Sequence, residues 1–124
     1  MHPHIIPLLE ELKDREIKIG LISNCFSEES KIIKESILYP YFDQVCLSYD
    51  CQLMKPDLKI FALCLDQLEC KAMECLYIGD GGSHELYSAT QIGMKAMQAC
   101  YYNYSRDVNF TPVYDPIDIL KYCK

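Results

Sequence analysis

The sequence predicts an α/β protein in which a parallel sheet of about four strands is covered by helices on both faces. Two observations carry this prediction. Segments with the apolar spacing of a helix alternate along the chain with short apolar runs, which is the pattern of strands joined by helical crossovers. Half of the 124 residues are hydrophobic, which is enough for the core of one domain over residues 1–124.

Helices are predicted where apolar residues recur at intervals of three and four. Ser27 and the acids after it favour one helix start, and Pro56 precedes another. Gly93 ends a third helix, and Asp115 is expected to cap a closing helix with Pro116 at its first position. The five predicted helices are residues 3–15, 27–38, 57–69, 83–91 and 115–123.

Strands are predicted for four short apolar runs, and residues 103–112 look irregular. In a parallel sheet with helical crossovers, ligands bind outside the carboxyl ends of the strands. The residues that follow each strand are therefore the candidates for a functional site. The four predicted strands are residues 17–24, 44–50, 75–79 and 95–101.

Ser23 and Asn24 follow the first predicted strand. A hydroxyl and free backbone N–H groups at this place can bind a phosphate oxygen, and the positive end of the next helix adds to the attraction. The alternative is that the two residues only form a turn.

Lys55 follows the second predicted strand and stands directly before Pro56, which restricts the backbone there. Its ammonium can neutralise a phosphate or a carboxylate across a cleft. The alternative is a solvated lysine beside an ordinary helix start.

Asp80 follows the third predicted strand in the stretch LYIGDGGSHEL. Carboxylate oxygens are preferred ligands of Mg²⁺, and Gly81 and Gly82 allow close approach of the backbone. Glu85 can orient a metal-bound water or hold Lys55, or it is only an acid in the first turn of a helix. His84 is expected at the rim.

Together these three strand ends resemble the motifs of the haloacid dehalogenase (HAD) superfamily, with its Rossmann-like core, and lean toward the phosphoglycolate-phosphatase-like branch. The resemblance implies that Ser23 and Asn24 bind the phosphoryl group. It implies that Lys55 stabilises the nucleophile and the phosphoryl charge, so that it is both catalytic and phosphate-binding. It also implies that Asp80 and Glu85 belong to a Mg²⁺ site.

The first motif of that family, Asp-x-Asp, is absent from the sequence, where Asp14 is the only aspartate before Ser23. Its first Asp attacks phosphorus and its second is a general acid and base. The family's cap is absent too, so the chain resembles the second half of a HAD protein. In the family the missing strand is central. We therefore expect either direct pairing of the strands that end at Asn24 and Asp80, or an open slot covered by self-association.

Two hypotheses on function follow. The chain is the phosphate- and Mg²⁺-binding half of a phosphatase that acts on a small phosphorylated metabolite and is inactive alone, or it is a non-catalytic binding protein or subunit of HAD-like fold. A homodimer or a separate N-terminal half is the expected partner for either. The sequence has no Gly-x-Gly-x-x-Gly for a dinucleotide and no Gly-x-Ser-x-Gly for a serine hydrolase.

Composition limits the partners further. The net charge of −6 argues against nucleic acid and anionic membranes, and no apolar run has the roughly 18–20 residues of a membrane span. The eight cysteines lie mostly in apolar runs and form no Cys-x-x-Cys pair, so we expect reduced thiols and a cytoplasmic protein.

Overall fold

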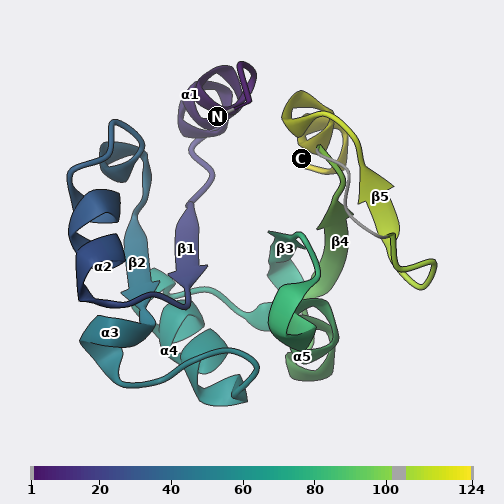
Figure 1. Cartoon of the computed structure of the whole chain (residues 1–124). Helices are drawn as coiled ribbons and strands as arrows, with labels where there is room; N and C mark the ends of the chain where they lie inside the picture. Colours follow the sequence, from purple (N-terminus) through teal and green to yellow (C-terminus); the bar gives the residue numbers. More distant parts are fainter. Residues whose placement is uncertain (1, 102–105, 124) are drawn as a thin grey trace.

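The computed structural model describes residues 2–101 and 106–123. Its elements alternate as the sequence predicts (Figure 1). The α-helices are α1 (Ile5–Asp14), α2 (Ser27–Lys34), α3 (Ser48–Cys51), α4 (Leu58–Leu68) and α5 (Glu85–Ile92). The 3₁₀ helices are η1 (Tyr39–Tyr41), η2 (Ala72–Glu74), η3 (Gly82–His84) and η4 (Pro116–Tyr122). The strands are β1 (Gly20–Ser23), β2 (Gln44–Leu47), β3 (Leu76–Gly79), β4 (Lys95–Ala99) and β5 (Thr111–Val113).

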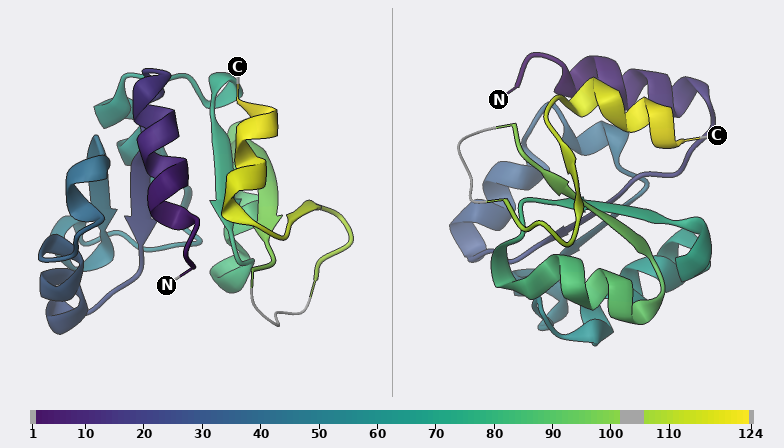
Figure 2. Two further views of the ribbon diagram at one scale, coloured as in Figure 1. Left: turned by 90° about the horizontal axis from the view of Figure 1, so that it is seen from above. Right: turned by 90° about the vertical axis from the view of Figure 1, so that its right-hand side faces the viewer.

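The described strands form two separate parallel sheets, one of β1 and β2 and the other in the order β3-β4-β5. This arrangement confirms the Rossmann-like α/β class. It also excludes one of the two expectations for the missing central strand, because β1 does not pair with β3. The collapsed four-stranded sheet is therefore wrong for this chain, and the two sheets stand apart in Figure 2. The other expectation, an open slot covered by self-association, stays a prediction.

Strand β5 corrects the prediction that residues 103–112 are irregular. Its register pairs Met97 with Thr111 and Ala99 with Val113, so β4 is an inner strand rather than an edge. Residues 103–105 lie outside the described part of the chain. The closing helix forms as predicted at its start, where the Asp115 side chain accepts a hydrogen bond from the Ile117 amide, but its turns are 3₁₀ rather than α.

Helices cover both faces of the sheets. Helix α1 and η4 lie side by side on one face, and α4 and α5 lie on the other (Figure 2). The buried cluster beneath α1 and η4 consists of Leu8, Leu12, Met97, Val113 and Ile119. The buried cluster beneath α4 and α5 consists of Cys46, Ile60, Phe61, Cys64, Ala89 and Met94.

Side chains rather than a backbone ladder join the two sheets. Helix α4 packs on β1 and β2, α5 packs on β3 and β4, and the two helices pack on each other. The Phe61 ring of α4 lies 5.4 Å from the Tyr77 ring of β3, between ring centres. Apolar burial therefore continues across the division between the sheets, although none of the described strands pairs across it.

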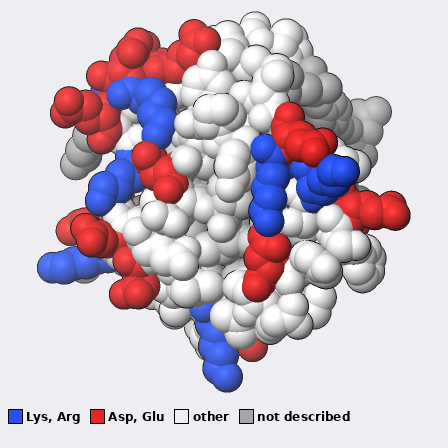
Figure 3. All heavy atoms as spheres, turned by 90° about the vertical axis from the view of Figure 1, so that its left-hand side faces the viewer, with Lys and Arg blue, Asp and Glu red and all other residues white. Residues whose placement is uncertain are grey.

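Charged side chains of both signs are interspersed on the face that carries α2 and β2 (Figure 3). Lys34 pairs with Asp50 at 2.8 Å, and Lys13 pairs with Asp43 at 2.8 Å. Among residues 2–101 and 106–123, no helix is both long enough and apolar enough to cross a membrane. All eight cysteines are free thiols.

Candidate active site

Asn24 fixes the backbone of Lys55. Asn24 directly follows β1, and its side-chain amide forms hydrogen bonds with both the backbone N–H and the backbone carbonyl of Lys55. The Lys55 amide donates to Asn24 Oδ1 at 2.8 Å, and Asn24 Nδ2 donates to the Lys55 carbonyl at 3.0 Å. The loop before α4 is thereby attached to the carboxyl end of β1, although the two segments are 31 residues apart.

The Lys55 ammonium reaches across to the second sheet. Its Nζ lies 2.9 Å from Glu85 Oε1 at the start of α5, and the two side chains are 14% and 5% exposed. The Tyr77 hydroxyl donates to the same Glu85 oxygen at 2.6 Å. Burial, followed by the hydrogen bond to Glu85, raises the pKa of Tyr77, so this phenol stays a neutral donor.

Glycine at position 79 makes room for the Glu85 carboxylate. A Cβ at position 79 would lie 2.5 Å from Glu85 Cδ, which is shorter than the contact distance of two non-bonded carbon atoms. The second carboxylate oxygen, Oε2, accepts a hydrogen bond from the Gly81 amide at 2.9 Å. Gly81 has φ of +102°, a conformation that favours glycine. Glu85 therefore accepts hydrogen bonds from donors in three different segments.

Asp80 lies at the carboxyl end of β3 with its side chain exposed to solvent. The Gly82 amide donates to Asp80 Oδ1 at 2.9 Å, and this bond holds the pKa of Asp80 below its usual range. The carboxylate is therefore anionic at neutral pH. An ionised, accessible carboxylate at a glycine-lined strand end fits Mg²⁺, which binds one or two carboxylates and keeps several waters.

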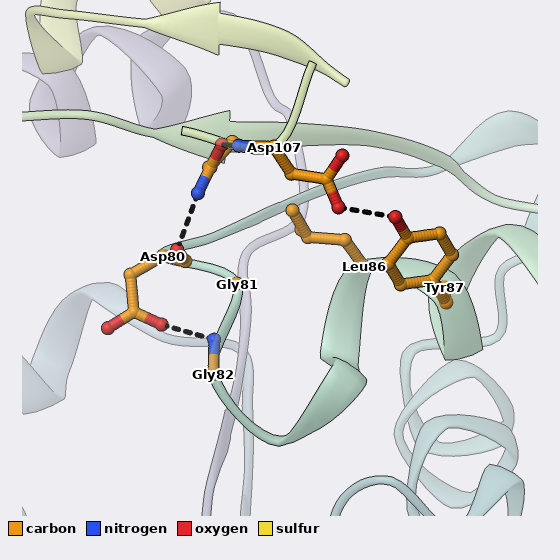
Figure 4. Close-up of a pocket in the computed structure, with 7 residues that line it drawn as sticks. Asp80, Gly81, Gly82, Leu86, Tyr87 and Asp107 are labelled. Carbon is orange, nitrogen blue, oxygen red and sulfur yellow. Dashed lines mark hydrogen bonds between the residues drawn. The ribbon is translucent and has the colours of Figure 1, made fainter. Parts of the chain in front are cut away.

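A hollow of about 270 Å³ lies beside the Asp80 loop (Figure 4). Of the five predicted site residues, Asp80 alone lines it. Figure 4 shows the Asp80 carboxylate turned away from Asp107 and toward the Gly82 amide. Lys55 and Glu85 do not line the hollow, which is therefore a separate feature beside the Asp80 loop.

Further hydrogen bonds connect residues that line this hollow. Gln98 of β4 is 2% exposed, and its Nε2 donates to the Asp80 carbonyl at 2.9 Å while its Oε1 accepts from the Asp107 amide at 2.7 Å. The Tyr87 hydroxyl donates to the Asp107 carboxylate. Gln98 therefore supports the Asp80 loop from behind.

The structure brings together the candidates that the sequence singled out. Ser23 ends β1 next to Asn24, Lys55 is hydrogen-bonded to Asn24, and Glu85 is paired with Lys55. Of the roles weighed for Glu85, the geometry shows that it holds Lys55. Its role as a metal ligand, and phosphate binding by Ser23 and Asn24, stay predictions.

Two contributors were missed. Tyr77 has a sequence signal, because period-two alternation in a strand places residues 77 and 79 on one face, toward α5. Gln98 has a weaker signal, a lone amide within an apolar run. Its contact with the Asp80 loop depends on the register that pairs Gly79 with Gln98.

Comparison with known proteins identifies the family. The family model described as haloacid dehalogenase-like hydrolase matches residues 1–99. A glyceraldehyde 3-phosphate phosphatase of Methanocaldococcus jannaschii is 35% identical over 95 residues, which are 75% of this chain and 41% of that protein. The rhythmically expressed gene 2 protein of Drosophila melanogaster is 33% identical over 89 residues, 69% of this chain and 34% of that protein.

Solved structures give the same result. The crystal structure of a HAD phosphatase from Thermococcus onnurineus superposes with a TM-score of 0.89 and 28% identity, covering 98% of this chain and 57% of that one. The chain thus spans about two fifths of the length of the M. jannaschii relative and just over half of this solved structure. The match over residues 1–99 and the 35% identical relative show that the chain belongs to the haloacid dehalogenase-like hydrolase family.

Proposed function

We propose that this chain is the phosphate- and Mg²⁺-binding half of a HAD-family phosphatase that cleaves small phosphomonoesters. The single observation that carries the proposal is the Lys55–Glu85 pair. It holds a lysine ammonium at the carboxyl ends of β1 and β3, beside the anionic carboxylate of Asp80. The HAD phosphatase relatives support hydrolase chemistry for this arrangement.

Phosphate binding is assigned to the first sheet and the Lys55 loop. The Ser23 hydroxyl and the backbone after β1 donate hydrogen bonds to phosphoryl oxygens, and the Lys55 ammonium neutralises their charge. Glu85 keeps Lys55 in place, since the carboxylate is itself fixed by Tyr77 and Gly81. Positioning and electrostatic stabilisation are most of what phosphoryl transfer requires of a protein.

Mg²⁺ is assigned to the Asp80 carboxylate, with Glu85 at the edge of the site. When bound, the ion supplies positive charge to the phosphoryl oxygens. The contribution of the chain is an anionic, accessible carboxylate whose loop is held by the Gly82 amide on one side and by Gln98 on the other.

The nucleophile is assigned to a segment outside this sequence. An Asp-x-Asp strand seated between β1 and β3 would pair with both and bring its first carboxylate to the phosphoryl group. A carboxylate oxygen then forms a bond to phosphorus while the ester oxygen of the substrate leaves, which gives an aspartyl-phosphate that water hydrolyses. Without that carboxylate the chain alone is inactive.

Turnover of p-nitrophenyl phosphate and glyceraldehyde 3-phosphate with Mg²⁺ tests the proposal. The chain alone should show none. Addition of an N-terminal segment with an Asp-x-Asp strand, taken from a homologous phosphatase, should produce turnover that Lys55→Gln abolishes. Lys59→Gln, which changes an exposed lysine on α4, is the matched control. Turnover by the chain alone would contradict the assignment of the nucleophile.

The alternative is a non-catalytic HAD-like binding module or subunit, and the absence of Asp-x-Asp favours it. Binding of inorganic phosphate separates the two. The phosphatase half should bind phosphate more tightly with Mg²⁺ present, and Asp80→Asn should remove that increase. A chain that binds neither ion, with or without the added segment, is a module that keeps the fold and has lost the site.

A further inference from the structure

A second cluster of metal-ligating side chains lies away from Lys55 and Asp80, where the start of the chain meets the start of η4. His2 and His4 precede α1, and Asp115 precedes η4. Each offers one ligand atom, and these three atoms lie within 4.8 Å of one another. Two imidazole nitrogens and one carboxylate oxygen thus converge from segments 111 residues apart.

Short contacts already order this cluster. His4 Nδ1 lies 2.8 Å from Asp115 Oδ2 and 2.9 Å from Oδ1. The His4 amide donates to His2 Nδ1 at 3.1 Å, which places the two rings 5.2 Å apart between centres. The His2 ring also lies 5.8 Å from the Tyr101 ring. These contacts hold the three side chains together, and the His4 and Asp115 side chains stay partly exposed to solvent.

The ligand set indicates the class of metal. Imidazole nitrogens suit Zn²⁺ and other first-row transition ions, whereas Mg²⁺ and Ca²⁺ prefer oxygen ligands. Two histidines and one carboxylate with water in the fourth position form a common zinc site. Ligands bound at about 2.0–2.2 Å to one tetrahedral ion lie roughly 3.4 Å apart. The His4 and Asp115 side chains, 49% and 33% exposed, can rotate over the remaining distance.

We propose that His2, His4 and Asp115 form a binding site for a transition metal ion such as Zn²⁺, which displaces the His4–Asp115 hydrogen bond. Helix α1 leads into β1, whereas η4 follows β5, and the two lie side by side (Figure 2). A metal bound here therefore connects the segment before the first sheet to the segment after the second sheet. The site needs neither phosphate nor an Asp-x-Asp segment, so it stands independently of the proposed phosphatase function.

Titration of the untagged chain with Co²⁺ in a non-thiol reductant tests the site. We expect one equivalent to bind with the visible absorption of cobalt in nitrogen and oxygen ligands, and Zn²⁺ to displace it. Substitution of a residue that only hydrogen-bonds to a metal ligand typically lowers metal affinity by about 10–100-fold. Loss of a direct ligand in His2→Gln or Asp115→Asn should therefore weaken binding at least about tenfold.

The third histidine of the chain provides the matched control. His84 lies in η3, and His84→Gln should bind Co²⁺ as the parent chain does. His2→Gln is the most informative variant, because the His2 side chain accepts an exposed hydrogen bond from the His4 amide and contacts the His4 and Tyr101 rings, so its loss is expected to leave the fold intact. Zn²⁺ should raise the melting temperature of the parent chain and of His84→Gln, but not of His2→Gln.

The eight free cysteines are the competing ligands for the metal ion. Binding through thiolates shows strong near-ultraviolet charge-transfer absorption and is unaffected by the histidine variants. If His2→Gln and the parent chain bind Co²⁺ with equal affinity, or if the absorption is that of thiolate ligands alone, the site does not exist.

Discussion

Lys55 Nζ and Glu85 Oε1 lie 2.9 Å apart and connect the two sheets at the edge where β1 and β3 end. Lys55 belongs to the side of β1 through its hydrogen bonds with Asn24, and Glu85 belongs to the side of β3 through Tyr77 and Gly81. Breaking a buried ion pair strongly destabilises the folded state, because removing one partner leaves the other charge buried without a counter-charge. The pair is therefore both a feature of the candidate site and a structural connection.

Glu85→Gln should destabilise the fold by about 3 kcal/mol, the lower end of the cost of removing one partner of a buried ion pair. The amide keeps an acceptor for Tyr77 but leaves the Lys55 ammonium without a counter-charge. Urea denaturation measures the change in the free energy of unfolding. Asp118→Asn removes the acid of an exposed pair with Lys121, and should change that free energy by less than about 0.5 kcal/mol. Equal effects of the two substitutions would show that Lys55 and Glu85 are solvated rather than buried.

Asn24→Ala should free the Lys55 backbone from β1. The substitution removes two hydrogen bonds and leaves the Lys55 amide and carbonyl in a half-buried loop, which should cost about 1–3 kcal/mol. It should also weaken phosphate binding, since Lys55 then loses its fixed position. Asn109→Ala, at an exposed asparagine with one hydrogen bond to Tyr87, is the control. If Asn24→Ala and Asn109→Ala have equal effects on the free energy of unfolding and on phosphate affinity, then Asn24 does not position Lys55.

Gly79→Ala should lower stability by about 1–3 kcal/mol through overpacking. The added methyl group would occupy the place of the Glu85 carboxylate and push it away from Lys55. Gly82→Ala is the matched control. A Cβ at position 82 would have Asp80 Oδ1 as its nearest neighbour, at 3.3 Å, and the φ of Gly82 is not in the left-handed region. Thermal melts of the two variants should differ clearly. Similar melting temperatures would mean that Glu85 has another position available.

Asp80 should titrate below the ordinary aspartate value of about 3.9. The Gly82 amide stabilises the charged form in the folded state, so the folded pKa lies below the unfolded one. The resulting stability is present above the unfolded pKa and is lost as the pH falls through the folded value. Carbon-13 NMR of the Asp80 carboxyl group measures the folded pKa directly. A midpoint at or above the ordinary value would show that the Gly82 hydrogen bond does not form in solution.

The alternation of helices and strands could be predicted from the sequence because it depends on local patterns, whereas the roles of the candidate site residues stay predictions. Apolar spacing indicates which segments are helices or strands, and parallel strands bring Ser23, Lys55 and Asp80 to one edge. Asp57 and Asp115 cap their helices as short-range chemistry predicts, each accepting a hydrogen bond from the amide two residues on.

The remaining features depend on contacts between distant segments. Strand β5 has three residues, one of them Pro112, and exists because β4 offers a free edge at Met97 and Ala99. The role of Glu85 depends on the distance between α5 and the Lys55 loop, which no pattern in LYIGDGGSHEL contains. The sequence left open whether β1 and β3 pair across the place of the missing Asp-x-Asp strand, and the structure shows that these two strands do not pair.

The separation of the two sheets affects how substitutions can change the distance between β1 and β3. Backbone ladders fix the spacing of paired strands at about 4.8 Å, but β1 and β3 are not paired. The side-chain contacts that connect the two sheets include Phe61 with Tyr77 and Lys55 with Glu85. Substitutions at these four positions can widen or narrow that distance while the hydrogen-bond register within each sheet stays unchanged. The geometry of the candidate site and the strand pairing, which are coupled in a continuous sheet, are therefore expected to vary independently in this chain.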